Sequence, residues 1–238
     1  MKIVIAPDSF KGSATSSEIA TWIQAGIHSV IPTCEIVKIP IGDGGEGSLD
    51  AILSAGFKAI ECEVKGPVGI LVKAYIALKD DTAFIEMAQA SGLSQLPGGV
   101  KSALKSSSFG AGELILAALN KGAKKIILAV GGSATTDAGA GALQALGAKL
   151  LDTAGNEIAR GGAALIDCVK INVSGLDPRL AQTTFVLASD VKNPLLGVDG
   201  AARVFSPQKG ASGEEVEILE KSVARFASLV GGPHAASP

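Results

Sequence analysis

KKIILAVGGSATTDAGAG, at residues 124–141, joins a short apolar run to a loop that contains no bulky side chain. The run at 124–130 has the length and branched side chains of a buried β-strand. The segment at 137–147 has the apolar spacing of a helix. Two interpretations of the small residues between them stay open: a tight, capped turn packed against the sheet, or a loop whose backbone approaches a ligand.

The segments around this unit predict a mixed sheet with helices. Residues 57–88 contain three extended runs separated by GPVG and KDD, which is typical of antiparallel hairpins. The sequence also predicts helices at 109–123 and 212–230, a hairpin at 148–159 and a strand at 183–190.

The first residues alternate between strand and helix patterns. KIVIA (2–6) and CEIVKIPI (34–41) are predicted strands, and each is followed by a predicted helix. The first of these helices begins at TSSE (15–18), which has the spacing of a capping box. This βαβα order predicts a parallel sheet, and the change in pattern after it predicts two domains, 1–65 and 66–238.

Composition excludes several classes of protein. The chain has 238 residues, 47% of them hydrophobic, a net charge of −2 and 4% aromatic residues. Without a basic face, a nucleic-acid partner is not expected, and no apolar run is long enough for a membrane span. Three cysteines without paired spacing favour a reducing compartment, so we expect a soluble, cytoplasmic protein.

Four loops with glycine and polar side chains follow predicted strands: 7–13, 42–47, 131–137 and 189–197. In parallel α/β sheets the carboxyl ends of strands form the ligand crevice, so these loops predict one polar site. Its candidate catalytic residues are Asp8, Lys11, Asp43 and Asp190. Either Asp43 or Asp190 is a candidate metal ligand, and the metal site itself stays unknown.

Each loop also has a purely structural interpretation. GDGGEG (42–47) matches a dinucleotide-binding spacing, but its carboxylates would repel a pyrophosphate. These carboxylates suit the recognition of a hydroxyl group, the binding of magnesium or the abstraction of a proton. The alternative is that they are solvated side chains in a tight turn. Lys11 is either a point charge for an anion or an exposed loop lysine.

The loop at 131–137 is the candidate phosphate cradle, in which small residues let backbone N–H groups face an anion. Asp137 is alternatively a helix N-cap. FSPQKGAS (205–212) either contributes the side chains of Gln208 and Lys209 to the site or is a surface turn. The candidate substrate- and phosphate-binding residues are Ser9, Gly12, Ser13, Gly44, Gly45, Glu46, Gly131, Gly132, Ser133, Thr135, Thr136, Asp137, Gln208 and Lys209.

Together these segments resemble the glycerate kinase family of the bacterial two-domain type. The resemblance rests on KIVIAPDSFKGS, IPIGDGGEGSLDAI, IEMAQASGL, GAGELILAAL, GGSATTDAGAGALQALGAK, SGLDPRL, NPLLG and FSPQKGAS, which occur in this order. It implies phosphorylation of D-glycerate by ATP with magnesium, usually to 2-phosphoglycerate, with 3-phosphoglycerate as the other product. It also implies a Rossmann- or flavodoxin-like parallel-sheet domain with a second, mixed α/β domain inserted into it.

The chain departs from the family pattern at three points. Phe109 replaces a tyrosine, and Ser189 and Lys192 replace a cysteine and an aspartate. Family members also extend beyond the point where this chain ends, so we expect an incomplete first domain and a truncated product. The alternative to an active kinase is therefore an inactive remnant that binds ligand weakly. A homo-oligomer is left open.

Overall fold

The computed structural model of the protein describes residues 1–10, 13–42, 44–45 and 47–231. The strands are β1 Lys2–Ile5, β2 Glu35–Lys38, β3 Lys58–Lys65, β4 Leu71–Lys79, β5 Thr82–Glu86, β6 Lys125–Ala129, β7 Lys149–Leu151, β8 Lys170–Asn172 and β9 Thr184–Ala188. The α-helices are α1 Ser16–Val30, α2 Ser48–Ser54, α3 Ala88–Ser91, α4 Phe109–Asn120, α5 Ala140–Ala145, α6 Ala201–Phe205 and α7 Gly213–Val230. The described residues also form the 3₁₀ helices η1 Leu93–Gln95, η2 Pro97–Gly99, η3 Gly162–Asp167, η4 Pro178–Gln182 and η5 Pro207–Lys209.

A five-stranded mixed sheet with the order β3-β4-β5-β6-β9 forms the centre of the larger body. β3, β4 and β5 are antiparallel, and β5, β6 and β9 are parallel. The predicted hairpins at 57–88 are therefore confirmed, as is the mixed α/β fold. β9 lies at the edge of the sheet, and its Leu187 is 65% exposed.

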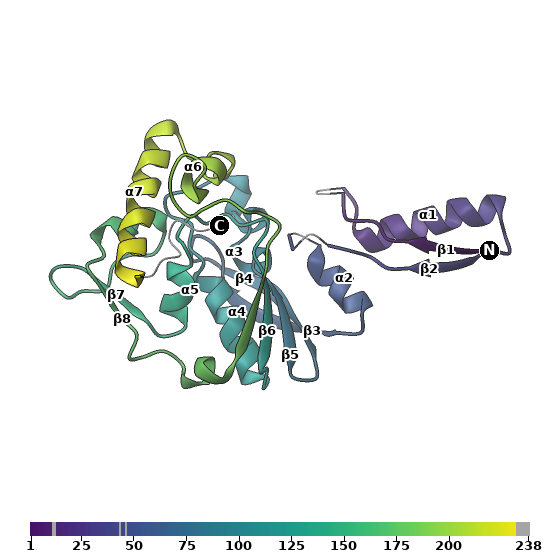
Figure 1. Cartoon of the computed structure of the whole chain (residues 1–238), viewed down its shortest axis with the longest axis horizontal. Coiled ribbons are helices and arrows are strands. Elements are labelled where there is room, and N and C mark those ends of the chain that lie inside the picture. The colour runs from purple at the N-terminus through teal and green to yellow at the C-terminus, as the bar shows by residue number, and fades with distance from the viewer. Residues whose placement is uncertain (11–12, 43, 46, 232–238) are drawn as a thin grey trace.

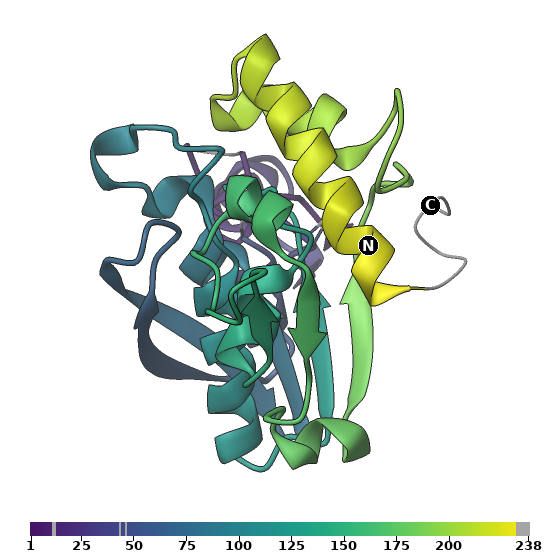
Figure 2. The ribbon, with the colours of Figure 1, turned by 90° about the vertical axis from the view of Figure 1, so that its left-hand side faces the viewer.

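The two faces of this sheet bury alternate residues of the same strands. On one face Ile76, Ile85 and Ile126 pack against α4 in the largest apolar cluster. On the other face Phe84 and its neighbours pack against α2. This is the alternation expected of a strand that is covered on both sides. β7 and β8 form a two-stranded antiparallel sheet, which packs with α7 in another apolar cluster. The helix α7 lies across the outside of the molecule (Figure 2).

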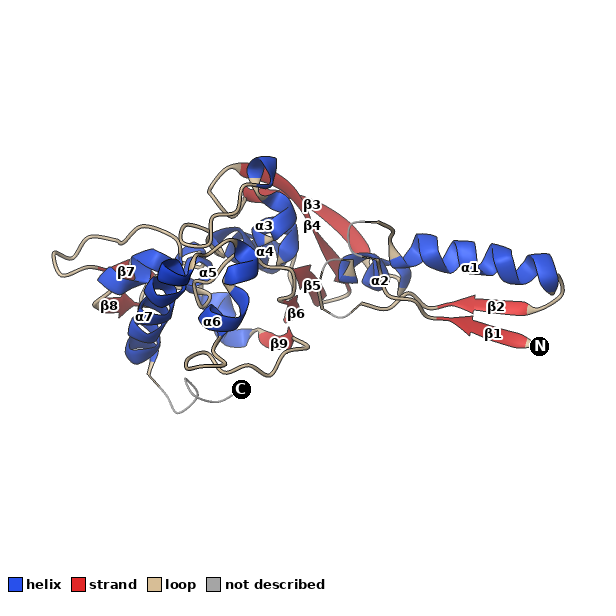
Figure 3. Ribbon diagram, turned by 90° about the horizontal axis from the view of Figure 1, so that it is seen from above, coloured by secondary structure: helices blue, strands red, loops and turns tan. Residues whose placement is uncertain are grey.

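The strands β1 and β2 and the helix α1 form an arm, residues 2–38, that projects from the larger body (Figures 1 and 3). β1 and β2 pair in parallel with each other and, within the described residues, with no other strand. Thr15 caps α1 in a full capping box with Glu18, as the sequence predicts. α1 leaves apolar side chains in solvent, and Trp22 is 61% exposed.

The helix α2 differs from the expected βαβα unit, because its apolar side packs on the five-stranded sheet. The division of the chain into two domains stays a prediction. The boundary that we predict at residue 66 falls in the turn between β3 and β4, two strands that pair along their whole length. In the described part of the chain no helix is long and apolar enough to cross a membrane.

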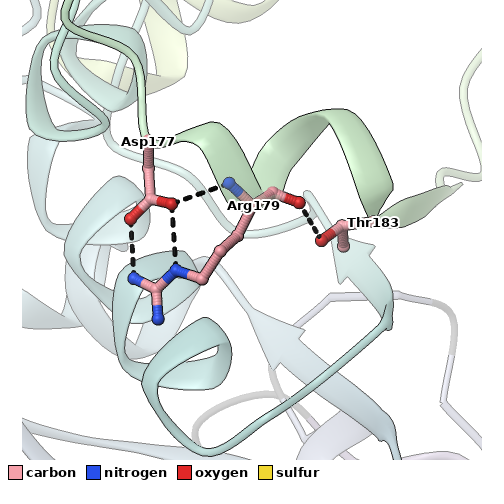
Figure 4. Close-up of polar contacts among 3 residues, drawn as sticks. All are labelled: Asp177, Arg179 and Thr183. Atoms are coloured by element: carbon pink, nitrogen blue, oxygen red, sulfur yellow. Dashed lines mark hydrogen bonds and ion pairs between the residues drawn. The ribbon is translucent and has the colours of Figure 1, made fainter.

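The SGLDPRL segment shapes the turn that precedes β9. Asp177 caps η4 by accepting a hydrogen bond from the backbone N–H of Arg179 at 3.0 Å, and the Arg179 guanidinium donates to both of its carboxylate oxygens (Figure 4). The side-chain hydrogen bonds from Arg179, followed by the backbone bond, lower the pKa of Asp177 to about 2. These residues line neither of the two cavities that form the site described below.

Candidate functional site

A polar crevice of about 360 Å³ lies where β6 and β9 end. Five segments of the described chain reach it, namely the loops after β2, β6 and β9, the turn that contains η1, and the segment that contains the end of α6 and η5. Its lining residues are Gly45, Leu93, Val130, Gly131, Gly132, Ser133, Ser189, Asp190, Val191, Phe205, Gln208 and Lys209. The structure thus brings together seven predicted site residues: Gly45, Gly131, Gly132, Ser133, Asp190, Gln208 and Lys209.

Position 131 requires a glycine because the backbone of another loop passes directly against it. Its N–H donates to the carbonyl oxygen of Gly44 at 3.0 Å. A Cβ atom on Gly131 would lie 2.5 Å from the Cα atom of Gly45, which is closer than real Cβ contacts allow. In turn, Gly44 has a positive φ of 85° and its N–H donates to the Ser48 hydroxyl at 3.0 Å. The glycines at 44–45 and 131 therefore let two loops touch.

The next two residues present unused hydrogen-bond donors. The carbonyl oxygen of Gly132 accepts a bond from the N–H of Leu93 at 3.1 Å, which fixes the loop. The backbone N–H groups of Gly132 and Ser133 form no hydrogen bond with any residue of the described chain. Consecutive free N–H groups in a glycine-containing loop form a concave site that suits an anion.

Among the described residues, Lys209 is the buried cation that lines the crevice, with only 7% of its surface exposed. Its Nζ donates to the Ser133 hydroxyl at 3.0 Å and to the Thr135 carbonyl oxygen at 2.5 Å. Burial lowers the pKa of Lys209 to about 8, although the nearby charge of Asp137 acts in the opposite direction. An ammonium group has three donors, so one remains for an anionic ligand.

Among the described residues, Asp190 is the carboxylate that lines the crevice. It is exposed and is the second residue after β9. Among the described residues no three His, Cys, Asp or Glu side chains gather closely enough to hold a metal ion by themselves. Magnesium is usually held by one or two carboxylates together with substrate phosphates, so Asp190 fits a magnesium ion that arrives with a nucleotide.

Thr135, Thr136 and Asp137 are buried and line a second cavity beside the crevice, not the crevice itself. The Asp137 carboxylate accepts hydrogen bonds from the Ser108 N–H and hydroxyl at 2.7 and 2.9 Å. It also accepts bonds from Gly139 and Gly141 at the start of α5, each at 3.3 Å. Asp137 therefore joins the starts of α4 and α5. The N-cap of α5 is Gly139, so Asp137 is not itself the N-cap that the sequence suggests as an alternative.

The loop at 7–13 lies apart from the crevice. Ser9 and Ser13 line a separate cavity of about 360 Å³ near the base of the arm. Asp8 is exposed, and its carboxylate accepts a hydrogen bond from the N–H of Ser9 at 2.7 Å. Asp8, Asp137 and Asp190 therefore do not share one cavity. The predicted site residues Lys11, Gly12, Asp43 and Glu46 lie outside the described residues.

Two residues near the site are not among the site residues that the sequence predicts. Glu86, at the end of β5, is fully buried, and its carboxylate accepts a hydrogen bond from the N–H of Leu49 at the start of α2. Phe109 lies under the guanidinium of Arg160, at 3.3 Å from the ring centroid. A carboxylate that directly ends an apolar run is the signal that could have identified Glu86.

Comparison with known proteins gives one consistent family. The family model described as "Glycerate kinase family" matches residues 3–236. The chain is 49% identical over 232 residues to a glycerate kinase from Haemophilus influenzae, and 48% identical over 233 residues to a glycerate 2-kinase from Escherichia coli K12. These alignments cover 96% and 97% of this chain.

A solved structure agrees with these sequence matches. The crystal structure of a candidate glycerate kinase 2 from Salmonella typhimurium LT2 superposes with a TM-score of 0.88 at 45% identity, covering all of this chain and 66% of that one. The chain spans 61% of the length of the two relatives named above. On the family match and these identities, the chain belongs to the glycerate kinase family.

Proposed function

We propose that the protein transfers a phosphoryl group from ATP to D-glycerate and forms 2-phosphoglycerate. The observation that carries this proposal is the crevice, where free N–H groups of a glycine loop meet a buried lysine and an exposed carboxylate. The choice of the 2-position rests on the Escherichia coli relative, which is called glycerate 2-kinase. Transfer to the 3-hydroxyl, which would give 3-phosphoglycerate, is the other reaction that the acceptor allows.

Phosphoryl transfer demands positioning and charge neutralisation more than covalent chemistry. In the proposal, the N–H groups of Gly132 and Ser133 and the ammonium group of Lys209 bind the oxygens of the transferred phosphate. Asp190 orients the acceptor hydroxyl or accepts its proton. Catalytic roles for Asp8, Lys11 and Asp43 stay predictions.

Magnesium belongs to the proposal as the partner of ATP, where it would neutralise phosphate charge. Asp190 is the described residue that would hold it, with Asp43 as the other predicted ligand. We also propose that the reaction takes place in the cytoplasm. The cysteines Cys34, Cys62 and Cys168 are all free in the structure, which fits a reducing compartment.

The test is a kinase assay on the purified chain with D-glycerate and Mg-ATP, with ³¹P NMR to identify the product. We expect 2-phosphoglycerate. Lys209→Met and Asp190→Asn should each lower kcat/KM at least about tenfold, since a charge-assisted hydrogen bond contributes about 1.5–3 kcal/mol. Lys221→Met, an exposed lysine on α7, is the matched control and should retain the parent rate.

The inactive-remnant hypothesis gives the opposite results. It predicts no turnover by this chain, with weak ATP binding that Lys209→Met does not alter. Turnover that is equal in the parent, Lys209→Met and Asp190→Asn would contradict the proposed roles of both residues in the crevice.

A further inference from the structure

A second, larger cavity of about 520 Å³ lies beside the crevice, and its volume is typical of small-molecule sites. The sheet strands β6 and β9 and the helices α4 to α7 all contribute to its wall. Most of its lining is apolar, including Met87, Ile115, Leu128, Leu187, Phe205 and Val223. Neither glycerate nor a phosphate has an apolar part of this size, so the cavity suits a different portion of a ligand.

This cavity and the crevice adjoin each other. Five residues line both, and they are Val130, Ser133, Val191, Phe205 and Lys209. The crevice thus continues into an apolar chamber, with the Lys209 ammonium group and the Ser133 hydroxyl at the junction. A ligand that occupies both would be anionic at one end and largely apolar at the other.

One polar group in the apolar chamber has no protein partner. Thr136 is 7% exposed and lines the cavity. Its hydroxyl is buried and forms no hydrogen bond with any described residue. A buried hydroxyl without a partner is rare in folded proteins and has a free-energy cost. Because the residue lines the cavity, rotation about its Cα–Cβ bond would bring the hydroxyl to a ligand with a polar edge, which would remove that cost.

The chamber also contains an aromatic ring and a strained backbone. Phe205, in α6, is half-buried on the wall, and an aromatic face stacks well on a planar base. Ala138, which lines the same cavity, has a φ of 49°, a conformation that costs energy for a residue with a Cβ atom. Strained residues of this kind gather at functional sites.

We propose that this chamber binds the base and ribose of the nucleotide donor, whose phosphates pass Ser133 and Lys209 into the polar crevice. Thr136 hydrogen-bonds the polar edge of the nucleoside, and Phe205 contacts the base. This assignment rests on the proposed function, which supplies the nucleotide, and it locates the donor and the acceptor on opposite sides of Lys209.

The test compares the binding of Mg-ATP and inorganic tripolyphosphate by isothermal titration calorimetry, because the second probe lacks the nucleoside. Thr136→Val removes the unpartnered hydroxyl and should weaken ATP binding roughly three- to tenfold. Ala201→Leu fills the chamber from the start of α6 and should weaken ATP binding more than Thr136→Val does. Both variants should bind tripolyphosphate within about twofold of the parent chain.

Ser206→Ala is the matched control. Its hydroxyl is also buried without a partner in the described chain, but it does not line the chamber, so its ATP affinity should equal that of the parent. ATP binding that is unchanged in both Thr136→Val and Ala201→Leu would overturn the nucleoside site. Lys209→Met tests the proposed function separately, since it should weaken the binding of tripolyphosphate as well as the binding of ATP.

Discussion

Lys209 is the residue at which the structure departs most from what its sequence context suggests. FSPQKGAS has the composition of a surface turn, and its Gln208 is indeed exposed. Lys209, the next residue, is buried and donates two hydrogen bonds to the loop that follows β6. These bonds join residues more than 70 positions apart in the sequence, and the composition of a short segment cannot reveal such a contact.

The depressed pKa of Lys209 predicts how stability depends on pH. Its pKa is about 8 in the folded chain and 10.5 in an ordinary lysine. Below about pH 8 both states hold the proton, and the group adds no pH dependence. Between about pH 8 and 10.5 only the unfolded chain holds it, so the free energy of unfolding gains about 1.4 kcal/mol per pH unit from this group.

Urea unfolding of the parent and Lys209→Met at a series of pH values measures this effect. The difference between their free energies of unfolding should move in favour of the parent as pH rises through this window. Equal pH slopes for the two proteins would contradict a depressed pKa. In the same window, tripolyphosphate binding by the parent should weaken as the ammonium group loses its proton.

At the scale of elements, Asp137 holds two helices in place. Asp137→Ala would leave the buried N–H and hydroxyl of Ser108 and the N–H of Gly141 without their acceptor. We expect the free energy of unfolding to fall by about 3 kcal/mol or more, since bonds to a charged group are strong and buried unpaired donors are costly. Chemical denaturation followed by circular dichroism measures the loss.

Asp152→Ala provides the comparison, because Asp152 also accepts backbone bonds, from Ala154 and Asn156, but in a surface turn. Its loss should be about 1 kcal/mol. Losses of similar size in the two variants would mean that the burial of Asp137 has no energetic consequence.

Elements built on local interactions could be predicted from the sequence. The capping box at Thr15 and Glu18 and the hairpins of β3 to β5 depend on residues close in the chain, and both are confirmed. The position of α2 could not be predicted, because a short amphipathic helix fits either sheet until both are built. The same holds for the site, where the loops are recognisable but their distribution among three cavities depends on tertiary packing.

At the scale of the whole molecule, Gly131 contacts the loop at 44–45. This contact joins the segment that leaves the arm to the loop that follows β6 of the five-stranded sheet. Gly131→Ala would force the two backbones apart, so we expect it to lower the free energy of unfolding by about 1–3 kcal/mol. ATP binding should weaken too, because both loops line the crevice. Thermal unfolding and calorimetry measure the two effects.

Gly26→Ala is the control for this substitution. Gly26 lies within α1, and a Cβ atom there meets nothing within 4 Å. The change should therefore stabilise the chain by about 0.5–1 kcal/mol through helix propensity. A Gly131→Ala protein as stable as Gly26→Ala would show that the loops tolerate separation.

The arm has a further consequence that follows from the segment that connects it to α2. Residues 39–47 connect β2 to α2, and Gly45 within this connection is also a wall of the crevice. The connection that carries the arm therefore also carries part of the crevice wall. We expect a molecule that binds the exposed side of α1 to alter ligand binding in the crevice, although it would not touch the crevice itself.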